Sequence, residues 1–274
     1  MESTYEQEVK KFGKKDGIAA ICVWLCYIIL TTAYAVVTNM MSISGNIRGV
    51  VGIILSILLA IGVLILVKKS KQNLASVGLH KENLGKAIGL GLLFCLIPIT
   101  VIAIIPGVLY GFNEVDASGL LLVLITTFFF AAHEDVIFIG FIQTRLYGLF
   151  KTHKAAIFVG AILFALMHVP LWIINGRLDF SQPLNIAMVF SAWISMHIIM
   201  VSIFKRYFSI LPVFIFHTIW NYSFNFARLG TIDFSLIAVA IALIAACLLY
   251  WRSYKLAKKQ GETEQKEQGD GFSD

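Results

Sequence analysis

Long apolar runs separated by short polar loops make up most of this chain of 274 residues. About 20 mostly apolar residues are enough for a helix to cross a bilayer. The pattern predicts eight such helices, at 17–40, 50–67, 87–111, 119–147, 155–174, 184–204, 210–227 and 232–251. We therefore predict an all-α, polytopic membrane bundle of about eight transmembrane helices, which occupies residues 17–251. A polar arm (1–16) precedes it, and a charged tail (252–274), which we expect to be disordered, follows it.

Lysine and arginine fall unevenly among the polar segments that flank these helices. From the N-terminus to the C-terminus, the nine segments hold 4, 1, 5, 0, 3, 1, 2, 1 and 5 of them. Cytoplasmic loops of membrane proteins carry the excess of positive charge, so the alternation predicts that both termini are cytoplasmic. One missed or added helix would break the alternation, which therefore supports the count of eight.

The amino-acid composition agrees with a membrane protein and argues against a soluble domain, a nucleic-acid-binding protein and a disulfide-rich protein. Hydrophobic residues make up 58% of the chain and charged residues 14%, whereas soluble domains are about a quarter charged. The net charge of +6 is explained by the cytoplasmic loops, and no interleaving of aromatic and basic residues indicates a nucleic-acid partner. The four cysteines lie in apolar runs without a CxxC pair, so no disulfide framework is expected. The expected partner on all sides is the lipid bilayer.

Seven polar side chains interrupt the apolar runs. They are His133, Glu134 and Asp135 in the fourth run, His168 in the fifth, His197 in the sixth, and His217 and Asn221 in the seventh. An ionisable group at the centre of a membrane helix costs roughly 2.5–3.5 kcal/mol on insertion scales, so such groups indicate function. A single intramembrane histidine can also be a hydrogen-bonded packing residue, and we interpret His197 in this way.

Four of these side chains are predicted to lie at similar depth. Counting about 1.5 Å per residue from the cytoplasmic basic flank, Glu134 and His217 lie about 16 Å deep, His168 about 21 Å and Asn221 about 22 Å. For Glu134, the depth is counted from Arg145, which is taken as the basic residue at the cytoplasmic end of the helix. Because the hydrocarbon core is about 30 Å thick, all four fall near its middle. Three helices can therefore present a carboxylate, two imidazoles and an amide to one cavity.

This set of groups suits the activation of water. A carboxylate can remove a proton from water, and an imidazole or an amide can donate to a developing oxyanion. Two histidines and one carboxylate also form a known catalytic zinc set. The zincin motif HExxH is not present, because His133 and Glu134 are followed by Asp135, Val136 and Ile137. The sequence leaves open whether a metal takes part.

The order of the motifs resembles the CPBP intramembrane protease family, the CAAX proteases and bacteriocin-processing enzymes, also called the Abi family. The family motif EExxxR corresponds to residues 134–139, FxxxH to residues 164–168 and HxxxN to residues 217–221. The stretch 74–93 is similar to the amphipathic segment that precedes the core in the family. The resemblance covers roughly residues 74–227, with its core at about 119–227.

The resemblance implies a role for each matching residue. Glu134 would activate water, His168 and His217 would be the essential histidines, and Asn221 would help to hold the oxyanion. The resemblance leaves the cofactor open: if zinc is bound, His168, His217 and Glu134 would be its ligands. The substrate would be a membrane protein or peptide. The implied location is the plasma membrane of a bacterium, which a multi-pass chain would span.

Two departures from the family motif bear on activity. Asp135 stands where the second glutamate is found, and Ile139 stands where the arginine is found. Losing the arginine and shortening its acid together leaves less unpaired charge. We expect Asp135 to bond to a neighbour such as His133, so that these two residues support Glu134.

Three functions remain open at this point. The first is an intramembrane endopeptidase that uses Glu134 to activate water. The second is a catalytically altered or inactive membrane scaffold or bacteriocin-immunity protein on the same fold, which the altered motif favours. The third is a proton-coupled transporter, with His197 and Asp135 as relay groups. A transporter of that kind is expected to contain paired broken helices from internal repeats, and no internal repeat is evident in the sequence.

Overall fold

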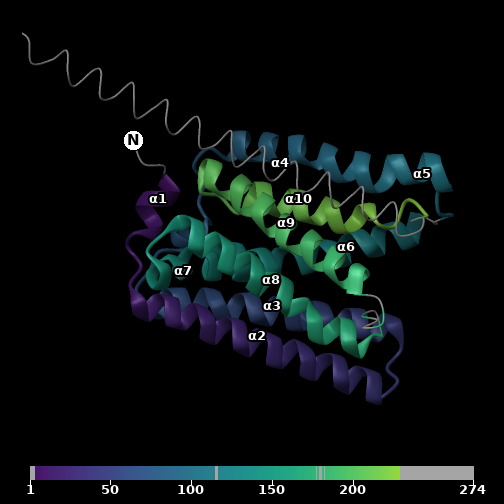
Figure 1. Ribbon diagram of the computed structural model, residues 1–274, viewed down its shortest axis with the longest axis horizontal. Helices are drawn as coiled ribbons and strands as arrows, with labels where there is room; N and C mark the ends of the chain where they lie inside the picture. Colours follow the sequence, from purple (N-terminus) through teal and green to yellow (C-terminus); the bar gives the residue numbers. More distant parts are fainter. Residues whose placement is uncertain (1–3, 115–116, 177, 179–180, 182, 229–274) are drawn as a thin grey trace, which may run out of the picture.

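A computed structural model describes residues 4–114, 117–176, 178, 181 and 183–228 of the chain. The described residues form a helical bundle whose long helices run roughly side by side (Figure 1). The elements are α1 (Thr4–Val9), α2 (Lys14–Met40), α3 (Gly45–Lys69), η1 (Leu74–Val77), α4 (Leu84–Pro98), η2 (Ile99–Ile104), α5 (Ile105–Tyr110), α6 (Ala117–Glu134), η3 (Asp135–Ile142), α7 (Gln143–Phe150), α8 (His153–Ile174), α9 (Pro183–Tyr207) and α10 (Leu211–Ser223).

Six of the predicted spans are helices long and apolar enough to cross a membrane. They are Lys14–Met40, Ile47–Lys69, Leu84–Tyr110, Ser118–Phe150, His153–Ile174 and Ile186–Tyr207. Their outward faces carry exposed large apolar side chains, such as Ile29, Leu58 and Leu121. The predicted all-α fold of a multi-pass integral membrane protein is confirmed.

The last two predicted spans are not among these six helices. The seventh, predicted at 210–227, is a helix only over the 13 residues of α10, which is about 20 Å long and too short to cross the hydrocarbon core alone. Residues 224–228 leave the helix, and a single antiparallel bridge joins this segment to the one after α5. The predicted eighth span and the predicted disordered tail lie outside the described residues.

Prolines lie both at the starts of helices and within them. Pro183 begins α9, and Pro212 lies in the first turn of α10, where a missing N–H group has no effect on the helical hydrogen bonds. Pro106 is the second residue of α5, which directly continues η2. Pro98 lies inside the span that starts at α4, and the helix continues beyond it as the π-helix η2. Proline in a helix interior removes one hydrogen bond, and such a change of helix type accommodates the loss.

The fourth span is one continuous helix of three parts, α6, η3 and α7. Its middle part, η3, is a π-helix that begins at Asp135, directly after Glu134. Gly140 in η3 allows η1 to approach closely, because a Cβ atom on Gly140 would lie 2.8 Å from the carbonyl oxygen of Val77. The acidic pair is therefore located where the helix changes from α to π, about midway along the span.

The loops predicted to be cytoplasmic gather at one end of the bundle. The Ile210 N–H donates to the Gly78 carbonyl at 3.1 Å, which joins the loop before α10 to the segment after η1. The Lys151 ammonium donates to the Phe12 carbonyl at 3.4 Å, which joins the loop after α7 to the chain before α2. We call this the charged end. Its assignment to the cytoplasm stays a prediction.

The N-terminal arm contains a short helix that the sequence analysis treated only as a polar segment. Tyr5 and Val9 on α1 are buried, and the Tyr5 ring packs edge-on against Phe204 and Phe208. Its hydroxyl makes a hydrogen bond with the side chain of Gln143, and burial raises the pKa of the phenol. The arm thus closes the charged end of the bundle beneath α7 and α9.

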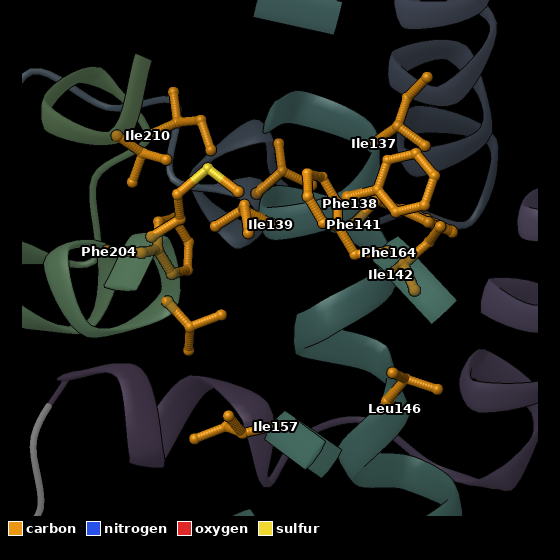
Figure 2. Close-up of a cluster of buried hydrophobic side chains, with 14 of the residues drawn as sticks. Ile137, Phe138, Ile139, Phe141, Ile142, Leu146, Ile157, Phe164, Phe204 and Ile210 are labelled. Atoms are coloured by element: carbon orange, nitrogen blue, oxygen red, sulfur yellow. The ribbon is translucent and has the colours of Figure 1, made fainter. Parts of the chain in front are cut away.

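The apolar core surrounds the π-helix. Figure 2 shows buried side chains of η3 packed among side chains from α7, α8, α9 and the loop before α10. Ile139 is fully buried in this cluster, and Phe138 packs edge-on against Phe164 of α8. The position where the family motif has an arginine is therefore an apolar core position in this chain.

Gly148 lies where α7 crosses the start of α2, and a larger residue there should destabilise the fold. A Cβ atom on Gly148 would overlap the backbone carbonyl of Gly13, which cannot turn aside as a side chain can. We expect Gly148→Ala to lower the stability of the purified protein by about 1–3 kcal/mol, the usual range for overpacking. Gly62→Ala is the matched control, because a Cβ there meets nothing within 4 Å. Thermal unfolding in detergent measures both, and equal midpoints would contradict the close crossing.

Candidate active site

The imidazole of His217 lies between two carboxylates. Its Nδ1 is 2.8 Å from Oδ1 of Asp135, and its Nε2 is 3.7 Å from Oε2 of Glu134. The two acids are consecutive residues at the α6–η3 junction, and they reach opposite nitrogens of one ring. His217 comes from α10, which packs directly against α6. The structure therefore brings together a carboxylate–imidazole–carboxylate group from two helices.

The two acids differ in their exposure and so in what they can do. The side chain of Asp135 is 1% exposed, and that of Glu134 is 17% exposed. Asp135 accepts the Nδ1–H of His217 and so orients the ring. Glu134 keeps an accessible carboxylate that is not engaged by a described donor at hydrogen-bond distance. Of the two, Glu134 is therefore the acid that can meet a water molecule or a substrate.

His168 is held by two contacts of different kinds. Its Nδ1–H donates to the carbonyl of Phe164 at 2.9 Å, one turn earlier in α8. Its ring stacks on Trp193 of α9 with centroids 4.4 Å apart and planes 15° apart. Since a carbonyl only accepts, this bond fixes the tautomer of the neutral ring and leaves Nε2 as a free acceptor. His168 also interacts electrostatically with His217.

Asn221 lies on α10 one turn after His217, so the two residues share a face of the helix. Its half-buried side chain makes no hydrogen bond with a side chain or backbone group in the described part of the chain. An amide that is partly accessible and has free donors can bind a substrate carbonyl. The prediction that Asn221 holds the oxyanion stays a prediction.

The expected bond between Asp135 and His133 does not form. His133 faces α2: its Nε2 accepts from the hydroxyl of Tyr27 at 3.1 Å, and its Nδ1 donates to the carbonyl of Phe129 at 3.3 Å. Asp135 uses His217 instead. The reason is helical geometry, because neighbouring residues on a helix point in different directions. His133 thus anchors α6 to α2.

His197 is a packing residue, as its interpretation from the sequence proposed. Its Nε2 is 2.8 Å from Oε1 of Gln143, and its ring packs against Phe164. Gly160 makes room for this pair, because a side chain there would overlap the Gln143 amide. The relay from His197 to Asp135 that a transporter would use is not formed, since each residue is bound to a different partner.

Arg145 is the residue that the sequence analysis most clearly misread. It served there as an exposed cytoplasmic flank, but its side chain is fully buried. Its guanidinium donates to the carbonyls of Ser76 and Gly140 and to the side chains of Gln72, Ser76 and Thr144, at 2.6–3.1 Å. Arg145 thus fastens η1 to the π-helix. Nothing in the charge count distinguished it from the lysines nearby.

The proposed zinc ligands are His168, His217 and Glu134. In the described ranges, no three His, Cys, Asp or Glu side chains are grouped so that they could hold a metal ion. One nitrogen of His217 is committed to Asp135, and His168 and Glu134 come from different helices. The His168–His217–Glu134 set therefore does not form a metal site in this conformation, and a zinc cofactor stays a prediction.

Comparison with known proteins agrees with the motif order. Residues 116–223 match the family model described as type II CAAX prenyl endopeptidase Rce1-like. The match covers less than half of the chain, but it runs from the start of α6 to the end of α10 and includes Glu134, His168, His217 and Asn221. A comparison with curated proteins found no match.

Fold and site together define a multi-pass membrane protein with a buried carboxylate–histidine group between the fourth spanning segment and α10. The family match identifies the class further. Residues 116–223 are similar to the CAAX endopeptidases of this family model, which confirms the resemblance to the CPBP/CAAX protease family found in the sequence.

Proposed function

We propose that this chain is an intramembrane endopeptidase that hydrolyses a peptide bond in a membrane-associated protein or peptide, with water activated by Glu134. The observation that carries the proposal is the His217 ring between Asp135 and Glu134, near the middle of a spanning helix. A buried acid pair costs free energy unless a positive partner offsets it. A fold that keeps both acids on one histidine is consistent with a chemical role for the exposed acid.

The proposed reaction assigns one step to each group. The carboxylate of Glu134 takes a proton from water while the water oxygen forms a bond to the scissile carbonyl carbon. The carbonyl oxygen becomes an oxyanion, to which the Asn221 amide donates. When the intermediate collapses, the C–N bond breaks and Glu134 returns its proton to the leaving amine. His217, oriented by Asp135, offsets the negative charge beside Glu134, and the free Nε2 of His168 accepts from the substrate or from water.

A second candidate function rests on one observation. Ile139 occupies a fully buried apolar position where the family motif has an arginine. A chain that has lost that arginine can serve as a scaffold or immunity protein on the same fold. The intact pairing of His217 with both acids favours the endopeptidase, because a scaffold has no need to keep Glu134 accessible.

The test compares cleavage of candidate membrane peptides by the wild-type protein and by His217→Ala, in vesicles, with mass spectrometry of the new termini. We expect the variant to lose cleavage by about 10²-fold or more, since Asp135 and Glu134 are then left without their shared partner. Size-exclusion profiles establish that the variant is folded, and zinc content is measured on the same samples. Equal cleavage by the two proteins would reject the endopeptidase and favour the scaffold.

A further inference from the structure

A cleft of about 450 Å³ connects the charged end of the bundle with Asp135. One wall is formed by residues 78–81, which follow η1. The opposite walls are Ala132, Asp135 and Val136 on the fourth span, and residues 209–211 with Phe214 at the start of α10. The cleft is thus bounded by the same two helices, α6 and α10, that supply Glu134 and His217. None of the site residues other than Asp135 lines it.

Two buried polar atoms on the cleft walls lack a partner among the described residues. The first is Oδ2 of Asp135, whose other oxygen accepts from His217. The second is Nδ1 of His80. The Nε2–H of His80 donates to the carbonyl of Phe208 at 2.7 Å, so Nδ1 of the neutral ring carries a lone pair. Both unpaired atoms are therefore hydrogen-bond acceptors, and they belong to residues that line the same cleft.

These acceptors limit what can occupy the cleft. A buried acceptor without a donor costs about 1–3 kcal/mol, so the occupant has to donate hydrogen bonds. A lipid chain offers no donor, whereas a water molecule offers two and is small enough to reach both atoms. The exposed Lys81 side chain lies on the same lining, towards the charged end. This is the end of the bundle where polar loops gather.

We propose that this cleft holds water and is the route by which water passes from the charged end of the bundle to Asp135 at mid-membrane. Water bound at Oδ2 of Asp135 is then in hydrogen-bonding continuity with His217 through the same carboxylate, and His217 faces Glu134. That this water is consumed in hydrolysis rests on the proposed function. That the cleft is hydrated does not, since it is argued from the two unpaired acceptors on residues that line the cleft.

Thiol labelling tests the hydration without any activity assay. Cys22, Cys26, Cys95 and Cys247 are first replaced by alanine. Single cysteines are then introduced by Ala132→Cys and Val136→Cys on the cleft wall, and by Ile125→Cys on the outward face of the same helix as a control. The probe is the charged, membrane-impermeant reagent sulfonatoethyl methanethiosulfonate, added to vesicles from the charged-end side.

We expect the cleft cysteines to react at least about tenfold faster than the Ile125→Cys control, because the reagent stays in water and only the thiolate reacts. Two cleft positions, Ala132 and Val136, are tested so that the result does not depend on one variant that fails to fold. If both cleft cysteines are as slow as the control, the cleft is dry or filled by lipid and the proposal is overturned. The labelling is repeated in a Glu134→Gln background. Fast labelling in both backgrounds, together with no peptide cleavage by the protein that keeps Glu134, would keep the water route and reject only the proposed function.

Discussion

Glu134→Gln is expected to slow peptide cleavage by about 10²–10⁴-fold, the usual contribution of a general base. Glutamine has the size of glutamate, but its amide cannot accept a proton from water. The fold should be kept, because Glu134 lies 3.7 Å from His217 and the ring is held in place by Asp135 at 2.8 Å. The loss should therefore appear in the rate of the chemical step.

The measurement is the single-turnover cleavage rate of a membrane peptide that the wild-type protein processes. Glu114→Gln is the matched control, because Glu114 is an exposed acid outside the site. It should leave the rate unchanged. If Glu134→Gln cleaves at the wild-type rate while it remains folded, Glu134 is not the base, and the role would have to pass to another group.

Arg145→Met is expected to have the largest effect on stability. The side chain is fully buried and donates to five acceptors on two segments of the chain, residues 72–76 and 140–144. It also stacks over the rings of Phe12 and Phe141, at 4.3 and 4.6 Å. Methionine fills much of the volume but satisfies none of the acceptors. Since each unsatisfied buried group costs about 1–3 kcal/mol, we expect a loss of about 3 kcal/mol or more.

The loss of stability in Arg145→Met should extend to the start of α2, because a chain of hydrogen bonds joins Arg145 to this region. Gln72 accepts from Arg145 and donates to Asp16 at 2.8 Å, and Asp16 accepts from the Gly13 N–H at the start of α2. Arg206→Met is the control, because Arg206 is exposed at the end of α9. Unfolding in mixed micelles with increasing sodium dodecyl sulfate measures both. Equal transitions for the two variants would show that Arg145 does not hold η1 in place.

Much of the fold could be predicted because lipid imposes a simple rule on the sequence. Spanning segments have to be apolar and about 20 residues long, so the first six could be located to within a few residues. The same rule overestimated the seventh. Residues 224–227 continue the apolar pattern, but their backbone turns away after Ser223 and pairs with the segment beyond α5. Composition alone does not report that partner.

The candidate site could be predicted only in part. Depth along the helices brought Glu134 and His217 to the same level, and the structure places them 3.7 Å apart. Depth does not specify direction around the helix axis, which is why Asp135 was paired with His133 although it bonds to His217. The stacking of Trp193 on His168 depends on packing between α8 and α9 that no local pattern reveals.

The π-helix between Asp135 and Ile142 changes how the fourth span can vary among relatives. A π-helix accommodates extra residues in its turns, and one residue corresponds to about 100° of rotation in an α-helix. The length of this segment therefore determines the angle around the helix axis between the acidic pair, which precedes or begins it, and Arg145, which follows it. An insertion or deletion here would turn the acids relative to the arginine without changing either residue. Alignments that fix the spacing between them would then compare side chains that face different directions.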